Sequence, residues 1–120
     1  MKKVVLALST LALTVSSALA LPATVPAASK LYSQPSLKST VSANVPAKSN
    51  ITIDSCKGGA RGWCTVTFQN QKGYMTRASV NAQGECQTLR AAGIGDIQRS
   101  EASYNRQRDP KNRGLACTKR

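Results

Sequence analysis

The segment 86–117, which begins and ends with cysteine, comes closest in this sequence to a chemical site. Its run Asp-Pro-Lys-Asn-Arg-Gly at 109–114 has the outline of an aspartate-rich calcium loop. Calcium takes six to eight oxygen ligands, several of them carboxylates. Lys111 and Arg113 stand at two ligand positions, which leaves only Asp109 and places two repelling cations beside it. We predict no metal site in this degenerate loop; the alternative is Asp109 as a lone calcium ligand.

The same segment concentrates positive charge. The chain has 17 Lys and Arg, 5 Asp and Glu and no His, a net charge of +12, and without Lys2 and Lys3 it would still carry +10. Such a charge favours polyanions, and guanidinium groups bind their oxyanions through paired hydrogen bonds. The predicted anion-binding residues are Arg106, Arg108, Lys111, Arg113, Lys119 and Arg120. The alternative is a solvated basic face with no fixed partner.

Catalysis has few suitable groups here. The absence of histidine removes the commonest general base. The acids outside the first 20 residues are scattered along the sequence: Asp54, Glu85, Asp96, Glu101 and Asp109. We therefore predict a protein that is not an enzyme, with no catalytic residue and no cofactor.

Residues 1–20 have the pattern of a secretory signal. Lys2 and Lys3 precede a short apolar core, and Ala18-Leu19-Ala20 is a typical cleavage site. The predicted mature chain begins at Leu21, has no transmembrane segment, and is secreted or held in the periplasm or cell envelope. An uncleaved membrane anchor is the alternative reading.

The four cysteines fit an oxidising compartment. They allow three pairings. Their order favours Cys56–Cys64 and Cys86–Cys117, since each pair then lies inside one candidate module. A zinc site is the alternative, although no Cys-x-x-Cys pair is present.

Short segments of alternating polar and apolar residues between turns predict a mainly β fold, a small twisted barrel. Thr52-Ile53 and 65–68 show this alternation. Residues 21–29, rich in Pro and Ala, predict a flexible lead-in, and 81–85 predict a linker.

Residues 30–80 resemble bacterial SH3 domains. Gly-Trp-Cys-Thr-Val-Thr-Phe at 62–68, followed by Gly73-Tyr74-Met75, carries the likeness. The resemblance implies an SH3-like barrel that recognises peptidoglycan stem peptide or another wall component, and some members have a disulfide that would correspond to Cys56–Cys64. Tyr32, Trp63 and Tyr74 would then be the ligand-binding residues of a shallow groove. Packing of these rings in the core is the alternative.

Residues 86–117 resemble the excalibur domain, a short extracellular calcium-binding module. The matching residues, in order, are Arg90-Ala91-Ala92-Gly93, Ile97, Tyr104, Asp109, Gly114, Ala116 and Cys117. Where the family has further acids, this chain has Lys111, Arg113 and Thr118. We expect a short helix over 87–92, closure by a disulfide, and a positive φ at Gly114.

These features together predict an exported, non-enzymatic binding protein of the bacterial envelope. Its expected partner is a cell-wall component or an anionic polymer, and an envelope protein is a further candidate. We expect the chain to be a monomer. Two alternatives stay open: a secreted regulator or inhibitor that docks to an acidic protein, and a non-specific extracellular nucleic-acid binder. Sequence-specific reading of DNA is not supported, because no recognition-helix or zinc-finger pattern is present.

Overall fold

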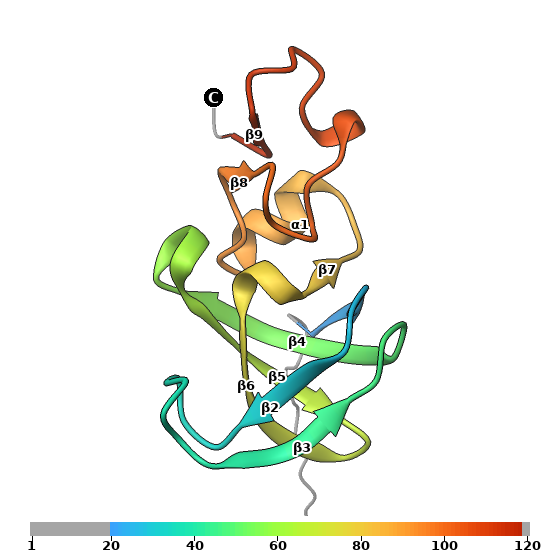
Figure 1. Ribbon diagram of the computed structural model, residues 1–120. Coiled ribbons are helices and arrows are strands. Elements are labelled where there is room, and N and C mark those ends of the chain that lie inside the picture. The colour runs from blue at the N-terminus through green and yellow to red at the C-terminus, as the bar shows by residue number, and fades with distance from the viewer. Residues whose placement is uncertain (1–19, 119–120) are drawn as a thin grey trace, which may run out of the picture.

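A computed structural model describes residues 20–118 (Figure 1). Apart from Ala20, the predicted signal segment lies outside the described residues, and so do Lys119 and Arg120. Among the described residues, no helix is both long enough and apolar enough to cross a membrane.

The described chain is mainly β, as predicted, and is built on a seven-stranded antiparallel sheet with the order β3-β2-β6-β5-β4-β1-β7. The strands are β1 (Leu21–Thr24), β2 (Ser29–Tyr32), β3 (Val41–Val45), β4 (Asn50–Lys57), β5 (Trp63–Phe68), β6 (Gln71–Thr76) and β7 (Asn81–Ala82). Short 3-10 helices follow β4 and β6: η1 (Gly59–Arg61) and η2 (Arg77–Ser79). The C-terminal segment, residues 86–118, contains α1 (Cys86–Ala91), η3 (Arg106–Arg108) and a two-stranded sheet of β8 (Ile97–Gln98) and β9 (Leu115–Ala116).

The β5–β6 hairpin follows directly from its sequence. Cys64, Val66 and Phe68 are buried, while the residues between them are partly exposed, which is the strand period of two. Gln69 and Asn70 connect the strands with φ values of 51° and 66°. Two successive positive φ angles are the requirement of a type I′ turn, whose twist matches that of an antiparallel hairpin.

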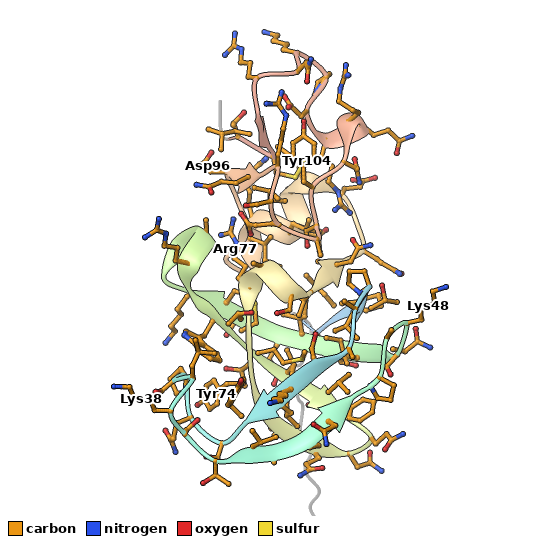
Figure 2. The ribbon with its side chains drawn as sticks, in the orientation of Figure 1. Lys38, Lys48, Tyr74, Arg77, Asp96 and Tyr104 are labelled. Carbon is orange, nitrogen blue, oxygen red and sulfur yellow. A yellow bond between two sulfur atoms is a disulfide. The ribbon has the colours of Figure 1, made fainter. Side chains whose placement is uncertain are left out.

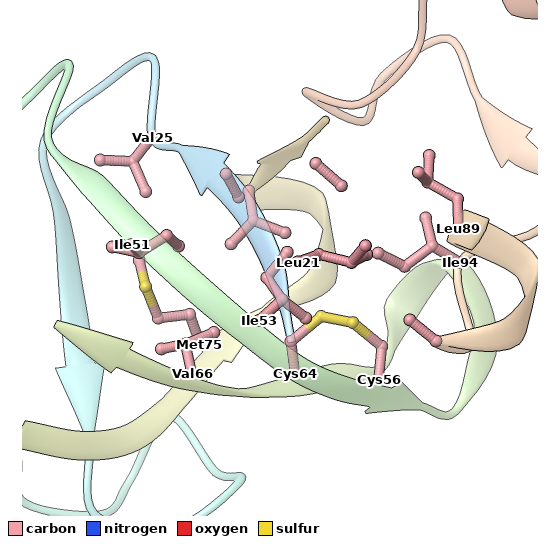
Figure 3. Close-up of a cluster of buried hydrophobic side chains, with 14 of the residues drawn as sticks. Leu21, Val25, Ile51, Ile53, Cys56, Cys64, Val66, Met75, Leu89 and Ile94 are labelled. Atoms are coloured by element: carbon pink, nitrogen blue, oxygen red, sulfur yellow. A yellow bond between two sulfur atoms is a disulfide. The ribbon is translucent and has the colours of Figure 1, made fainter. Parts of the chain in front are cut away.

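One continuous hydrophobic core runs through the sheet and the C-terminal segment. Figure 3 shows Leu21, Ile53 and Met75 of the sheet in the same cluster as Leu89 and Ile94. In Figure 1 the C-terminal segment stands on one end of the curled sheet, next to β7 and η2. The two predicted modules therefore share their apolar interior.

The predicted flexible lead-in at 21–29 is wrong. Leu21–Thr24 is strand β1, which pairs with β4 and β7. Its alternate residues Leu21 and Ala23, and then Val25, are buried. The pattern is short, with Pro22 and Thr24 between its buried residues, and only the distant partners β4 and β7 turn it into a strand.

The predicted linker at 81–85 is also partly wrong, because Asn81–Ala82 forms β7 at the edge of the sheet. Both predicted disulfides are present, Cys56–Cys64 and Cys86–Cys117, so the other pairings and the zinc alternative are excluded. The predicted helix is α1, and Gly114 has the expected positive φ, 90°.

Candidate binding groove and cationic tip

A groove of about 470 Å³ lies on the outer face of the sheet. Ser55, Thr65 and Tyr74 stand opposite one another on β4, β5 and β6, and so form a row across three strands. Trp63 lies on the same face as Thr65, two residues along β5, since side chains alternate between the two faces of a strand. The residues that line the groove are Pro35, Ser55, Lys57, Gly58, Arg61, Gly62, Trp63, Thr65 and Tyr74.

The structure brings the three predicted ligand-binding residues together. Trp63 and Tyr74 line the groove directly. Tyr32 pairs with Tyr74 across β2 and β6, and its ring packs edge-on against Trp63, with 5.6 Å between ring centroids and an interplanar angle of 87°. All three side chains are partly exposed and none belongs to the buried core, whereas Phe68 does. The groove interpretation therefore describes their placement better than core packing.

Lys57 and Arg61 give the groove a positive rim that the sequence interpretation missed. Both residues are exposed, and no carboxylate lies among the residues that line the groove. The available signal was their position: they flank the glycine-rich turn between Cys56 and Cys64.

The C-terminal segment holds the hairpin that carries this rim. The Cys56 amide of β4 donates a hydrogen bond to the Ala92 carbonyl of the C-terminal segment at 2.7 Å. From outside that segment, the Arg77 amide of η2 adds a hydrogen bond to the Gly62 carbonyl at 3.0 Å. Gly93 has φ 94°, and a Cβ built on it would lie 2.0 Å from the Cys56 carbonyl oxygen. Only glycine fits this approach, so the contact depends on the residue type.

Arg77 makes a second connection between the sheet and the C-terminal segment, and lies where the two meet (Figure 2). Its guanidinium forms a bidentate ion pair with Glu101, with Nε to Oε1 at 2.7 Å and Nη2 to Oε2 at 3.1 Å. It also donates to the carbonyls of Gly93 and Gly95. Both charged side chains are almost fully buried. No local sequence pattern predicts this ion pair, since the two residues are 24 positions apart.

The Asp109 carboxylate closes the degenerate loop from within. It accepts hydrogen bonds from the Tyr104 hydroxyl and from the amides of Arg113 and Gly114, both at 2.9 Å. These donors, the Tyr104 hydroxyl first among them, hold the pKa of Asp109 below its usual value although burial opposes the shift. The carboxylate thus stabilises the turn that a metal would organise in a calcium loop.

No cluster of three or more His, Cys, Asp or Glu side chains suited to a metal ion is present between residues 20 and 118. The positions that would complete a calcium site beside Asp109 hold Lys111 and Arg113, whose side chains are exposed. The loop at 109–114 therefore has no second carboxylate to offer a calcium ion beside Asp109. That it binds no metal stays a prediction, based on the residue types at the ligand positions.

The exposed cations Arg106, Lys111 and Arg113 form what we call the cationic tip, at the end of the molecule away from the β2–β3 hairpin. Figure 2 shows long nitrogen-bearing side chains pointing outward there. Lys119 and Arg120 follow it in the sequence, outside the described residues.

Arg108, also predicted to bind anions, has a structural position instead. Its guanidinium donates to the carbonyls of Ser103 at 2.7 Å, Ala82 at 3.0 Å and Gly84 at 2.8 Å. Burial lowers the pKa of this side chain, and the three carbonyls occupy three of its five donors. Arg108 therefore joins the C-terminal segment to β7, and anion binding by this residue stays a prediction.

No protein-family model matches the chain, and no curated protein matches it. Among solved structures, NlpC2 from Trichomonas vaginalis resembles it with a TM-score of 0.48 and 24% sequence identity. The likeness covers 57% of this chain and 24% of NlpC2, so the chain spans about a quarter of that protein's length. Neither family membership nor enzymatic activity follows from this likeness.

Proposed function

We propose that this chain is an exported, non-enzymatic binding protein of the bacterial envelope, which recognises a peptide or glycan of the cell wall. The aromatic groove on β4–β6 is the recognition site, and the cationic tip adds attraction to anionic polymer. The observation that carries the proposal is the groove itself, in which Trp63 and Tyr74 are partly exposed and Tyr32 supports Trp63. Partly exposed aromatic rings with a few polar neighbours are typical of ligand sites.

The resemblance of residues 30–80 to bacterial SH3 domains, and of 86–117 to the excalibur domain, supports the choice of an envelope ligand. The two disulfides fit an oxidising, extracellular environment, as the predicted signal segment requires. Export itself is part of the proposal.

The non-enzymatic part of the proposal is supported by how three of the five acidic groups between residues 20 and 118 are used, the other two, Glu85 and Asp96, being exposed and outside the groove. Glu101 pairs with Arg77, Asp54 pairs with Lys72 at 2.6 Å, and Asp109 accepts the Tyr104 hydroxyl. The groove is lined by neither a carboxylate nor a thiol. Its polar side chains are hydroxyls and cations, which suit binding more than proton transfer.

The test is retention of residues 21–120 on purified, insoluble cell wall over a series of salt concentrations. We expect Trp63→Ala to lower retention at every salt concentration, since the groove loses its largest ring. We expect retention of the unaltered chain to fall as salt rises from about 50 mM to about 500 mM, because salt screens the exposed cations. Failure of the folded chain to bind wall at any salt concentration would refute the proposal.

The cationic tip and the net charge of +12 also suit the alternative partner, an acidic protein. Capture of one saturable envelope protein, together with no retention on wall, would favour that function. A shift of DNA fragments regardless of their sequence, at moderate salt, would favour the nucleic-acid alternative.

A further inference from the structure

We infer that the ligand of the aromatic groove carries a free carboxylate, in the form of a short peptide with its C-terminus at Lys57 and Arg61. This inference rests on the proposed function, because it assumes that the groove is the recognition site. It names the chemistry of the ligand, which the shape of the groove by itself leaves open.

The charges around the groove are complementary to an anion. Lys57 and Arg61 line it, and its other lining residues are uncharged. The ion pairs between residues 20 and 118 join Lys72 to Asp54 and Arg77 to Glu101, so neither rim cation has an acidic partner. Asp54, which precedes the groove residue Ser55 on β4, is thus already neutralised by Lys72.

The backbone between the two cations is held in place before any ligand arrives. Cys56 and Cys64 are directly opposed on β4 and β5 and are joined by a disulfide. Lys57 pairs with Trp63, and a Cβ added to Gly62 would lie 1.8 Å from the Lys57 carbonyl oxygen. A turn fixed in this way loses little backbone freedom when a ligand binds, which favours affinity.

A peptide carboxylate uses more of this groove than phosphate does. The planar guanidinium of Arg61 can donate two parallel hydrogen bonds to a carboxylate, and Lys57 adds a point charge. Beyond the cations, the hydroxyls of Ser55 and Thr65 offer partners for peptide groups, and Trp63 offers an apolar surface. Inorganic phosphate would meet the cations but would leave the aromatic surface uncovered. A volume of about 470 Å³ lies within the usual range for small ligands.

The experiment uses residues 21–120 and two matched probes, N-acetyl-trialanine with a free carboxylate and the same peptide as its C-terminal amide. Trp63 is the single tryptophan of the chain, so its fluorescence reports on the groove. We expect the acid to bind about ten-fold more tightly than the amide, which corresponds to about 1.4 kcal/mol.

In the double variant Lys57→Gln/Arg61→Gln this preference should fall to about two-fold or less, since the cations are gone. The matched control is Lys30→Gln/Lys48→Gln, which removes two exposed lysines that do not line the groove and should keep the preference. Inorganic phosphate should not displace the acid at equal concentration. Equal binding of acid and amide, no response to either, a preference that survives in Lys57→Gln/Arg61→Gln, or equal displacement by phosphate would overturn the inference.

Failure of this inference is distinct from failure of the proposed function. Retention on cell wall that depends on Trp63, without preference for the acid, leaves the function standing and refutes the carboxylate. Preference for the acid without retention on wall refutes the proposed function and leaves the carboxylate inference standing. The peptide ligand would then come from another source.

Discussion

The guanidinium of Arg77 and the carboxylate of Glu101 face each other in two parallel hydrogen bonds inside the molecule, where water does not reach them. Glu101 also accepts the Gln98 amide at 2.8 Å, and Arg77 donates to two carbonyls of the C-terminal segment. Four of the five guanidinium donors and both carboxylate oxygens therefore have a partner, which a buried ion pair needs if it is to be tolerated. It fixes η2, at the end of the sheet, to the loop that follows α1.

Glu101→Gln should lower the free energy of unfolding by about 3–5 kcal/mol, because it leaves the Arg77 charge buried without a counter-charge. Urea denaturation followed by circular dichroism measures the loss. Lys72→Gln is the matched control, since it breaks an exposed ion pair with Asp54 and should cost less than about 1 kcal/mol. Similar losses in the two variants would contradict the importance given to burial.

Gly93→Ala and Gly59→Ala separate backbone strain from steric clash. Both glycines have positive φ, 94° and 71°, so alanine is strained at either position. Only at Gly93 does the added Cβ meet the Cys56 carbonyl oxygen, at 2.0 Å, whereas at Gly59 nothing lies within 4 Å. We expect Gly59→Ala to cost about 1 kcal/mol and Gly93→Ala clearly more. Equal midpoints in urea for the two variants would contradict the close contact.

Protonation of the Asp109 carboxylate should lower the stability of the folded chain in acid. Its pKa is lowered in the folded state, chiefly by the Tyr104 hydroxyl, so the folded state favours the carboxylate. This contribution is fully present above the unfolded-state pKa and is lost as pH falls through the lower, folded-state pKa. Thermal melts from about pH 7 to about pH 2 should therefore show a shallower acid decline for Asp109→Asn than for the unaltered chain. The exposed acid Asp96, changed to Asn, serves as control, and parallel curves for all three proteins would count against the prediction.

Arg108 and the cationic tip should respond differently to loss of charge. Arg108→Gln removes the donors for the carbonyls of Ser103, Ala82 and Gly84, and should reduce stability by about 1–3 kcal/mol. The triple variant Arg106→Gln/Lys111→Gln/Arg113→Gln removes exposed charge and should keep its stability within about 1 kcal/mol. It should instead weaken the salt dependence of retention on cell wall. If the triple variant lost stability while Arg108→Gln changed only the salt dependence of retention, the tip and not Arg108 would be structural.

Local patterns in the sequence were enough to predict much of the fold. Period-two alternation identified β5, the order of the cysteines favoured both disulfides, and the segment after Cys86 was predicted to be the helix α1. Each of these features depends on neighbours in the sequence, or on a small set of possible pairings. Strand β1 was missed because its two alternating buried residues become a strand only through pairing with β4 and β7.

The sequence was enough to predict the aromatic residues of the groove, but its basic rim, Lys57 and Arg61, was missed. Tyr32, Trp63 and Tyr74 were proposed together, and the structure places them together. Which basic residue is exposed at a groove, buried in an ion pair, or bonded to carbonyls depends on contacts across the fold. Lys57, Arg77 and Arg108 look alike in a sequence of high positive charge, yet they have these three different positions.

Strand β1 has a consequence for the timing of folding. Leu21 to Thr24 pairs with Asn50 to Ile53 and, through Ala23 and Thr24, with Asn81 and Ala82. A chain that emerges N-terminus first must therefore wait for about 60 further residues before its earliest strand meets its last partner, and contacts between such distant residues form slowly. Until then the apolar side chains of β1 lack part of the interior that they enter in the folded chain, so completion of the sheet depends on its two most distant segments.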